Sequence, residues 1–131
     1  RRVAAMPLMV TGGFRSRAGM EAALASGDTD VIGLARPLCT EPDAARRLLA
    51  REIDTLPTHE KHLMLAPSGW RSPASPLLLM KVVNILGAQG WYYQQMDRLA
   101  LGQSPDLGRG VLRSFLRYWR DDLGRALRMR R

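Results

Sequence analysis

Two short apolar runs separated by a helical segment constrain the fold of this chain more than any other feature. The first run covers residues 8–11 and ends at a pair of glycines, and the second covers residues 31–34. Between them, residues 18–26 carry apolar side chains at helical spacing. Two apolar strands joined by a helix in so short a stretch are typical of a parallel sheet with buried strands. The sequence therefore predicts an α/β fold that contains a strand, a helix and a second, parallel strand.

Composition divides the chain into three parts. Residues 1–56 hold the strand–helix–strand unit and a further helix, expected over residues 41–52 with Thr40 as its cap. Residues 57–76 carry four of the eight prolines, which predicts a linker. Residues 77–131 form the third part, which we expect to be a helical extension.

The extension is expected to form two helices, over about residues 77–101 and about residues 107–129. The second is strongly amphipathic. Its apolar face carries Leu112, Phe115, Leu116, Trp119, Leu123 and Leu127, and Arg113, Arg117, Arg120 and Arg128 lie mostly on the other face.

The net charge of +8 comes mainly from arginine and can indicate contact with nucleic acid or an acidic surface. The arginine-dense tail is interrupted by Asp121 and Asp122, so we interpret it as a solvated helix face and expect no nucleic-acid partner. A membrane-spanning helix needs roughly 20 apolar residues, and the longest apolar run is shorter, so we expect no membrane partner. Cys39 is the only cysteine, and with no secretory leader ahead of the first strand it favours the cytoplasm.

Three other groups of residues carry weaker signals. His59, Glu60 and His62 lack the spacing of a metal motif, so we expect surface histidines and no metal. Cys39 is expected to be a small buried residue rather than a reactive thiol. The aromatic residues 91–93 continue a helical apolar stripe, which favours core packing over stacking on a base or a cofactor.

The turns that follow the two strands carry the strongest functional signal. At the carboxyl end of a parallel strand, backbone N–H groups of the turn point outward without partners and can bind an anion. Glycine permits positive φ and close approach of a phosphate, and Arg36 adds a charged, bidentate donor. Gly12-Gly13 alone could be a tight turn, and Gly33 alone could be a close-packed strand residue. The pair of turns together predicts a phosphate site.

The stretch "PLMVTGGFRSRAGMEAALASGDTDVIGLARPLCTEPD" resembles the C-terminal end of the barrel in the old yellow enzyme family, the FMN-dependent NADH:flavin oxidoreductases and ene-reductases. This resemblance covers roughly residues 7–53. It implies a TIM (β/α)₈ barrel with FMN at its carboxyl face, of which this chain holds strands 7 and 8 with their helices. The FMN phosphate is then expected to contact Gly12, Gly13, Ala35 and Arg36, with Ala35 standing where many members have glycine.

The resemblance also implies a reaction. The chain is expected to be the C-terminal portion of an FMN-dependent oxidoreductase in which NADH or NADPH reduces the flavin, which then delivers hydride to a small activated alkene. A complete barrel takes about 250 residues. The family's catalytic groups come from earlier strands, so no catalytic residue is assigned and we expect the isolated chain to be an inactive fragment. The helical extension is then expected to pack beside the barrel.

Two alternatives remain open from the sequence. The chain could be part of another phosphate-binding flavin barrel with different chemistry. It could instead be a small basic helical module that binds nucleic acid or an acidic surface through its arginine-rich tail. The oligomeric state is not indicated by any feature of the sequence.

Overall fold

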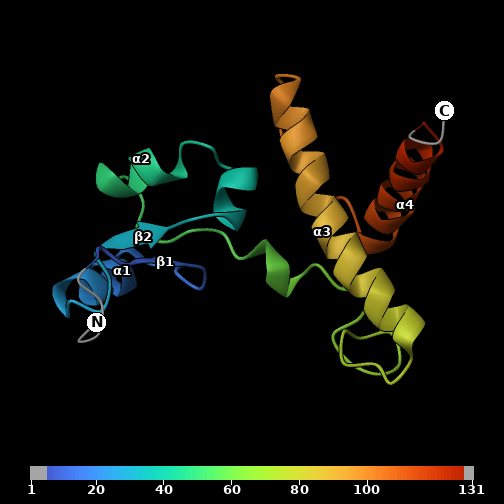
Figure 1. The fold of residues 1–131 in the computed structure, drawn as a ribbon, viewed down its shortest axis with the longest axis horizontal. Coiled ribbons are helices and arrows are strands. Elements are labelled where there is room, and N and C mark those ends of the chain that lie inside the picture. The colour runs from blue at the N-terminus through green and yellow to red at the C-terminus, as the bar shows by residue number, and fades with distance from the viewer. Residues whose placement is uncertain (1–5, 129–131) are drawn as a thin grey trace. The chain divides into compact units, whose positions relative to one another are not determined.

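The computed structural model describes residues 6–128, and the chain divides into two compact units between Thr58 and His59 (Figure 1). The first unit contains β1 (Met9–Thr11), α1 (Arg17–Ala25), β2 (Val31–Gly33), the 3₁₀ helix η1 (Arg36–Cys39) and α2 (Ala44–Leu49). The second unit contains the 3₁₀ helix η2 (His59–Lys61), α3 (Leu78–Ala100) and α4 (Val111–Arg128).

The first unit contains the predicted strand, helix and parallel strand. β1 and β2 pair in parallel, with Thr11 opposite Gly33. The Ser16 hydroxyl caps α1 by accepting a hydrogen bond from the backbone N–H of Gly19 at 3.2 Å. After the helix, Gly27 adopts the left-handed conformation, with φ 73°, that ends many helices. This part of the fold prediction is confirmed.

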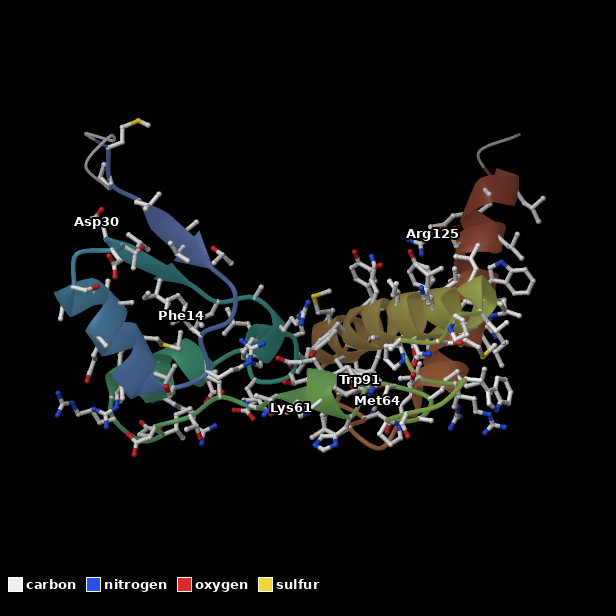
Figure 2. The ribbon with its side chains drawn as sticks, turned by 90° about the horizontal axis from the view of Figure 1, so that it is seen from below. Phe14, Asp30, Lys61, Met64, Trp91 and Arg125 are labelled. Carbon is white, nitrogen blue, oxygen red and sulfur yellow. The ribbon has the colours of Figure 1, made fainter. Side chains whose placement is uncertain are left out.

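The two strands are more exposed than predicted. Met9 is 62% exposed and Val31 is 48% exposed, so the prediction of fully buried strands is wrong for the described structure. The reason is that this sheet has two strands, and the core of the unit gathers around the helices. Its buried members are Met20, Ala44, Leu48 and Leu56, with Phe14 (labelled in Figure 2), Ile32, Leu34, Leu38 and Ile53 packed against them.

The end of the first unit returns to the start of α1. Thr55 forms an antiparallel bridge with Ser16, and the backbone N–H of Leu56 donates to the carbonyl of Arg15 at 2.7 Å. The buried side chain of Leu56 adds an apolar contact to the same return. The backbone on either side of Ser16 is therefore fixed by residues 54–56, much farther along the chain.

The predicted third helix is present but shorter than expected. Instead of residues 41–52 it covers Ala44–Leu49, and the chain then turns at Arg51, which has φ 59°. Thr40 does not cap this helix, contrary to the prediction. Its hydroxyl donates to the carbonyl of Pro37 at 3.1 Å and closes η1 instead.

The second unit is built on α3 and α4. The predicted position of α3 is confirmed, whereas α4 begins at Val111, four residues after its predicted start, and its predicted end at Met129 lies outside the described residues. The two helices approach each other at glycines of α3. A Cβ atom added to Gly87 would lie 2.6 Å from Val111 Cγ1, and one added to Gly90 would lie 2.7 Å from Tyr118 Cβ. Glycine at both positions is therefore what allows α4 to lie so close to α3.

Polar side chains complete this helix contact. Gln94 donates to the carbonyl of Ser114 at 2.9 Å and accepts from Arg109 at 2.9 Å. Gln95, which is fully buried, accepts from the backbone N–H of Asp106 at 2.7 Å. These bonds satisfy the side-chain oxygen and nitrogen of Gln94 and the side-chain oxygen of Gln95, atoms that would otherwise be costly to bury.

The aromatic prediction is confirmed at Trp91, which is 1% exposed and forms an apolar cluster with Leu63 and Val111. Figure 2 labels it beside the segment that contains η2. The His59 ring stacks at a tilt on Trp91, with 5.3 Å between ring centroids, so His59 is half-buried rather than a surface residue. Tyr93 remains 47% exposed and stacks on Tyr118.

The proline-containing segment before α3 belongs to the second unit. Asn84 of α3 holds it by accepting from the backbone N–H of Leu65 and donating to the carbonyl of Arg71, each at 2.9 Å. The predicted domain boundaries after residues 56 and 76 remain predictions. Across residues 6–128, no helix combines the length and the apolar character that crossing a bilayer requires.

Candidate phosphate-binding site

All four sequence-predicted site residues line one small hollow in the first unit. The hollow has a volume of about 160 Å³ and lies where β1 and β2 end. Its lining residues are Gly12, Gly13, Arg15, Gly33, Leu34, Ala35 and Arg36. The parallel pairing of the strands brings the two turns together, because both strands end at the same edge of the sheet.

The first turn requires glycine for its backbone conformation. Gly12 has φ 105° and Gly13 has φ 78°, values that residues with a side chain adopt only at a cost. The position that a Cβ would occupy has no neighbouring atom within 4 Å at either glycine. The space over the turn is therefore open to a ligand that approaches the backbone.

Gly33 has a different role. A Cβ at this position would collide with the hydroxyl of Thr11 and lie 2.9 Å from Thr11 Cβ. The interpretation of Gly33 as a close-packed strand residue is therefore confirmed by the sheet geometry. Its contribution to the hollow is to let the two strands pair closely enough for their turns to meet.

The second turn supplies backbone donors and a positive charge. Ala35 has φ −127°, so an alanine is tolerated there. Within residues 6–128, the backbone N–H groups of Gly13, Ala35 and Arg36 donate no hydrogen bond to another residue. Arg36 is exposed and makes no ion pair with any described residue. The arrangement offers both N–H donors and a guanidinium to an anion.

Arg15 is a site residue that the sequence analysis missed. It lines the hollow, its carbonyl is held by the N–H of Leu56, and its Nη1 donates to the carbonyl of Phe14 at 2.8 Å. The sequence did contain an indication of this role, because Arg15 lies only two residues after Gly13. Nearby Arg17 is engaged elsewhere, because its hydrogen bonds to Asp54 hold the carboxylate and raise the pKa of Arg17.

A larger cavity of about 350 Å³ lies elsewhere in the same unit. Its walls are mainly apolar side chains of α1, β2 and α2, such as Met20, Ile32 and Leu48. Its lining contains no glycine and includes the acidic side chain of Glu21, so the smaller hollow is the better phosphate candidate.

Two further candidates from the sequence can now be placed. No cluster of three or more metal-ligating side chains occurs in the part of the chain that the structure describes. Cys39 is half-buried, its Sγ lies 3.8 Å from the carbonyl oxygen of Ala35, and desolvation raises the pKa of its thiol. A raised pKa lowers the thiolate fraction at neutral pH and fits the expected unreactive thiol.

The fold and the hollow are those of an α/β unit whose strand-end turns suit an anion. Comparison with known proteins identifies relatives of the chain that belong to a more specific class of protein. The chain is 33% identical over 96 residues to the NADH-dependent flavin oxidoreductase iccE of Talaromyces variabilis, a match that covers 72% of the chain and 22% of iccE. It is 55% identical over 40 residues to the NADH-dependent flavin oxidoreductase iliE of Neonectria sp. (strain DH2), covering 30% of the chain and 5% of iliE.

These matches confirm the resemblance to an old yellow enzyme-like family, because both relatives are flavin oxidoreductases. The chain spans only about a fifth of the length of iccE. No family model matches the chain. No solved structure matches it either.

Proposed function

We propose that this chain is the C-terminal portion of an FMN-dependent NADH or NADPH oxidoreductase and that its two strand-end turns bind the phosphate of FMN. The observation that carries the proposal is the single hollow lined by Gly12, Gly13, Ala35 and Arg36, which come from two turns more than 20 residues apart. The relatives support the same class, since both are named NADH-dependent flavin oxidoreductases.

The residues present fit a phosphate group. The lining of the hollow contains two arginines and no acidic side chain, so a dianion meets no repulsion from its walls. Arg36 and Arg15 would supply charge, while the N–H groups of Gly13 and Ala35 would donate hydrogen bonds to phosphate oxygens. When bound, FMN would supply hydride transfer between a nicotinamide cofactor and a small activated alkene.

The proposal also gives β1 and β2 a place in a larger sheet. In a (β/α)₈ barrel, phosphate sites are often formed by the loops after strands 7 and 8 together with a short extra helix. η1 begins at Arg36, directly after the second turn. We propose that the exposed apolar residues Met9 and Val31 are covered by other strands of that barrel, and that the isolated chain is inactive because its catalytic groups lie there.

The test uses the intact protein that carries this chain, with its natural ends. Its visible spectrum is recorded, the chromophore is released with acid, and the affinities for FMN and for riboflavin are measured on the apoprotein. Arg36→Ala should weaken FMN binding by about tenfold to a hundredfold, as expected for the loss of a charged hydrogen bond. Riboflavin binding should be unchanged, because riboflavin lacks the phosphate.

The matched control is Arg46→Ala, which removes an exposed arginine of α2 outside the hollow. It should leave both affinities unchanged. A colourless protein without FMN affinity would contradict the proposed function. A yellow protein in which Arg36→Ala affects FMN and riboflavin equally would contradict the assignment of the phosphate site while preserving the flavin class.

A further inference from the structure

The strongest observation that the proposed function leaves unexplained is the apolar row of α4, formed by Leu112, Leu116, Trp119, Leu123 and Leu127. These side chains are between 47% and 67% exposed. They recur every three or four residues, so they form one continuous stripe along a helix about 27 Å long.

The apolar row is not the face that α4 uses within its own unit. Contact with α3 runs through Val111, Ser114 and Tyr118, which lie against the glycines of α3. Figure 1 shows the two helices separating toward the C-terminal end of α4. The row is therefore an unpartnered face of the second unit, and its size calls for a ligand or a partner.

An arginine row follows the apolar row along the helix. Arg113, Arg117 and Arg120 each lie one residue after a member of the apolar row, which places them about 100° around the helix. Together with Arg109 and Leu116 they line a shallow hollow of about 310 Å³ that contains no acidic lining residue. Arg113 forms no ion pair with any residue of the described range, whereas Arg117 and Arg120 share the carboxylate of Asp121, at 3.6 and 3.4 Å. Two arginines on one carboxylate leave this row with a net positive charge.

We propose that α4 docks on an anionic phospholipid surface, with the apolar row inserted among the acyl chains and the arginine row on the headgroup phosphates. A helix with a strongly apolar face, arginines on its polar side and low net hydrophobicity has the composition of an interfacial helix. This docking differs from spanning, so it is compatible with the lack of a spanning helix among residues 6–128. It revises the expectation from sequence that the protein has no membrane partner.

The combination of charge and apolar character on α4 favours an anionic phospholipid surface over nucleic acid as its partner. A nucleic-acid backbone would pair with the arginines but would leave the apolar row in water. A phospholipid surface offers phosphates and hydrocarbon at adjacent depths, which matches two adjacent rows on one helix. The inference does not depend on the flavin site, which lies in the first unit.

The experiment is co-sedimentation of the intact protein that carries this chain with two kinds of vesicle. One kind is pure phosphatidylcholine, and the other contains about a third phosphatidylglycerol. The bound fraction should be at least about tenfold higher on the anionic vesicles and should fall as salt rises. The part of the tryptophan emission that is lost in Trp119→Phe should shift to shorter wavelength on binding, because Trp119 is 55% exposed in the free protein.

Two variants separate the rows, and each has a matched control. Leu116→Ser with Leu123→Ser should abolish binding, whereas Leu78→Ser with Leu79→Ser, which changes two exposed leucines of α3, should not. Arg113→Gln with Arg117→Gln should remove the preference for anionic vesicles, whereas Arg46→Gln with Arg47→Gln should keep it. Far-UV circular dichroism verifies that each variant retains its helices.

One result of the vesicle experiment supports the proposal, and the others contradict it. Binding to anionic vesicles that depends on both rows supports the proposal. Failure to bind any vesicle overturns it, whether the protein remains monomeric or sediments as a dimer through α4. Equal binding to neutral and anionic vesicles overturns it as well, as does binding to duplex DNA that survives the leucine substitutions while vesicle binding is absent.

Discussion

The two units use glycine for opposite purposes. In the first unit, Gly12 and Gly13 provide positive φ, and open space surrounds the position of the missing side chain. In the second unit, Gly87 and Gly90 have ordinary helical backbones, and the missing side chain is what admits the neighbouring helix. The first use shapes a surface that a ligand can reach, whereas the second fixes a contact inside the protein. Substitutions at Gly12 and Gly13 should therefore affect ligand binding in addition to straining the backbone, whereas substitutions at Gly87 and Gly90 should affect stability.

The cores of the two units also differ in how much structural change they tolerate. The first unit packs aliphatic side chains such as Met20 and Leu48, which can adjust to small changes in volume. The second unit encloses a tryptophan and two hydrogen-bonded glutamines, Gln94 and Gln95. A polar network of this kind demands one geometry, because each broken bond leaves a buried group unsatisfied.

The largest expected effect is that of Trp91→Ala. Removing a side chain that is 1% exposed should lower the free energy of unfolding of the second unit by about 3–5 kcal/mol. Hydrogen exchange, followed by mass spectrometry, should show faster exchange in α3 and α4 and unchanged exchange in α1. Trp70→Ala is the matched control, because Trp70 is 59% exposed and its loss should cost less than about 0.5 kcal/mol. Equally faster exchange in both units would show that the stability of the first unit depends on the second.

The next effect tests the first unit. Gly33→Ala should destabilise the β1–β2 pair by about 1–3 kcal/mol, because its methyl group would collide with Thr11. Thr11→Ala removes the hydroxyl and one methyl group, so the double variant should recover part of the loss in a double-mutant cycle measured by chemical denaturation. Additive losses would show that the collision is relieved in some other way.

The first unit was largely predictable from sequence because its determinants are local. The glycines at positions 12, 13 and 27 require particular backbone conformations, and the distance between the two apolar runs allows only a short crossover. Arg15 was missed because its place at the hollow depends on Leu56, far along the chain, which fixes its backbone. The length of α2 was overestimated because Thr40 closes η1 rather than starting the helix.

The second unit was predictable in its helices but not in its contacts. Amphipathicity identified the apolar row of α4, but it could not show that α3 would instead contact Ser114, which is fully buried. Gln94 and Gln95 are polar by type, and only the fold provides the bonds that make their burial possible. The spacing of Gly87 and Gly90, three residues apart on α3, was the available signal for a close helix contact.

The close contact at these glycines leads to a third prediction, in which two glycine substitutions change the stability of the protein in opposite directions. Gly124→Ala in α4 should stabilise the protein by up to about 1 kcal/mol, since an added Cβ has no neighbour within 4 Å and alanine favours the helix. Gly87→Ala gains the same helical preference, but its Cβ would lie 2.7 Å from the carbonyl oxygen of Val111, so a net loss of about 1 kcal/mol is expected. Thermal unfolding of both variants measures the difference. A stabilising Gly87→Ala would show that α4 can move away from α3 at little cost.

The smallest effect concerns Cys39, which reports on the first unit alone. Desolvation raises the pKa of its thiol, so the folded state retains the thiol proton more strongly than the unfolded state does. The group therefore favours folding at pH values below the ordinary thiol pKa of about 8.5, and this contribution fades as the pH rises above that value. Alkylation by iodoacetamide should accordingly reach half its maximal rate at a higher pH than in an unfolded control. Trp91→Ala should leave this profile unchanged, because Trp91 belongs to the other unit; a shift toward the unfolded profile would show that the two units lose their structure together.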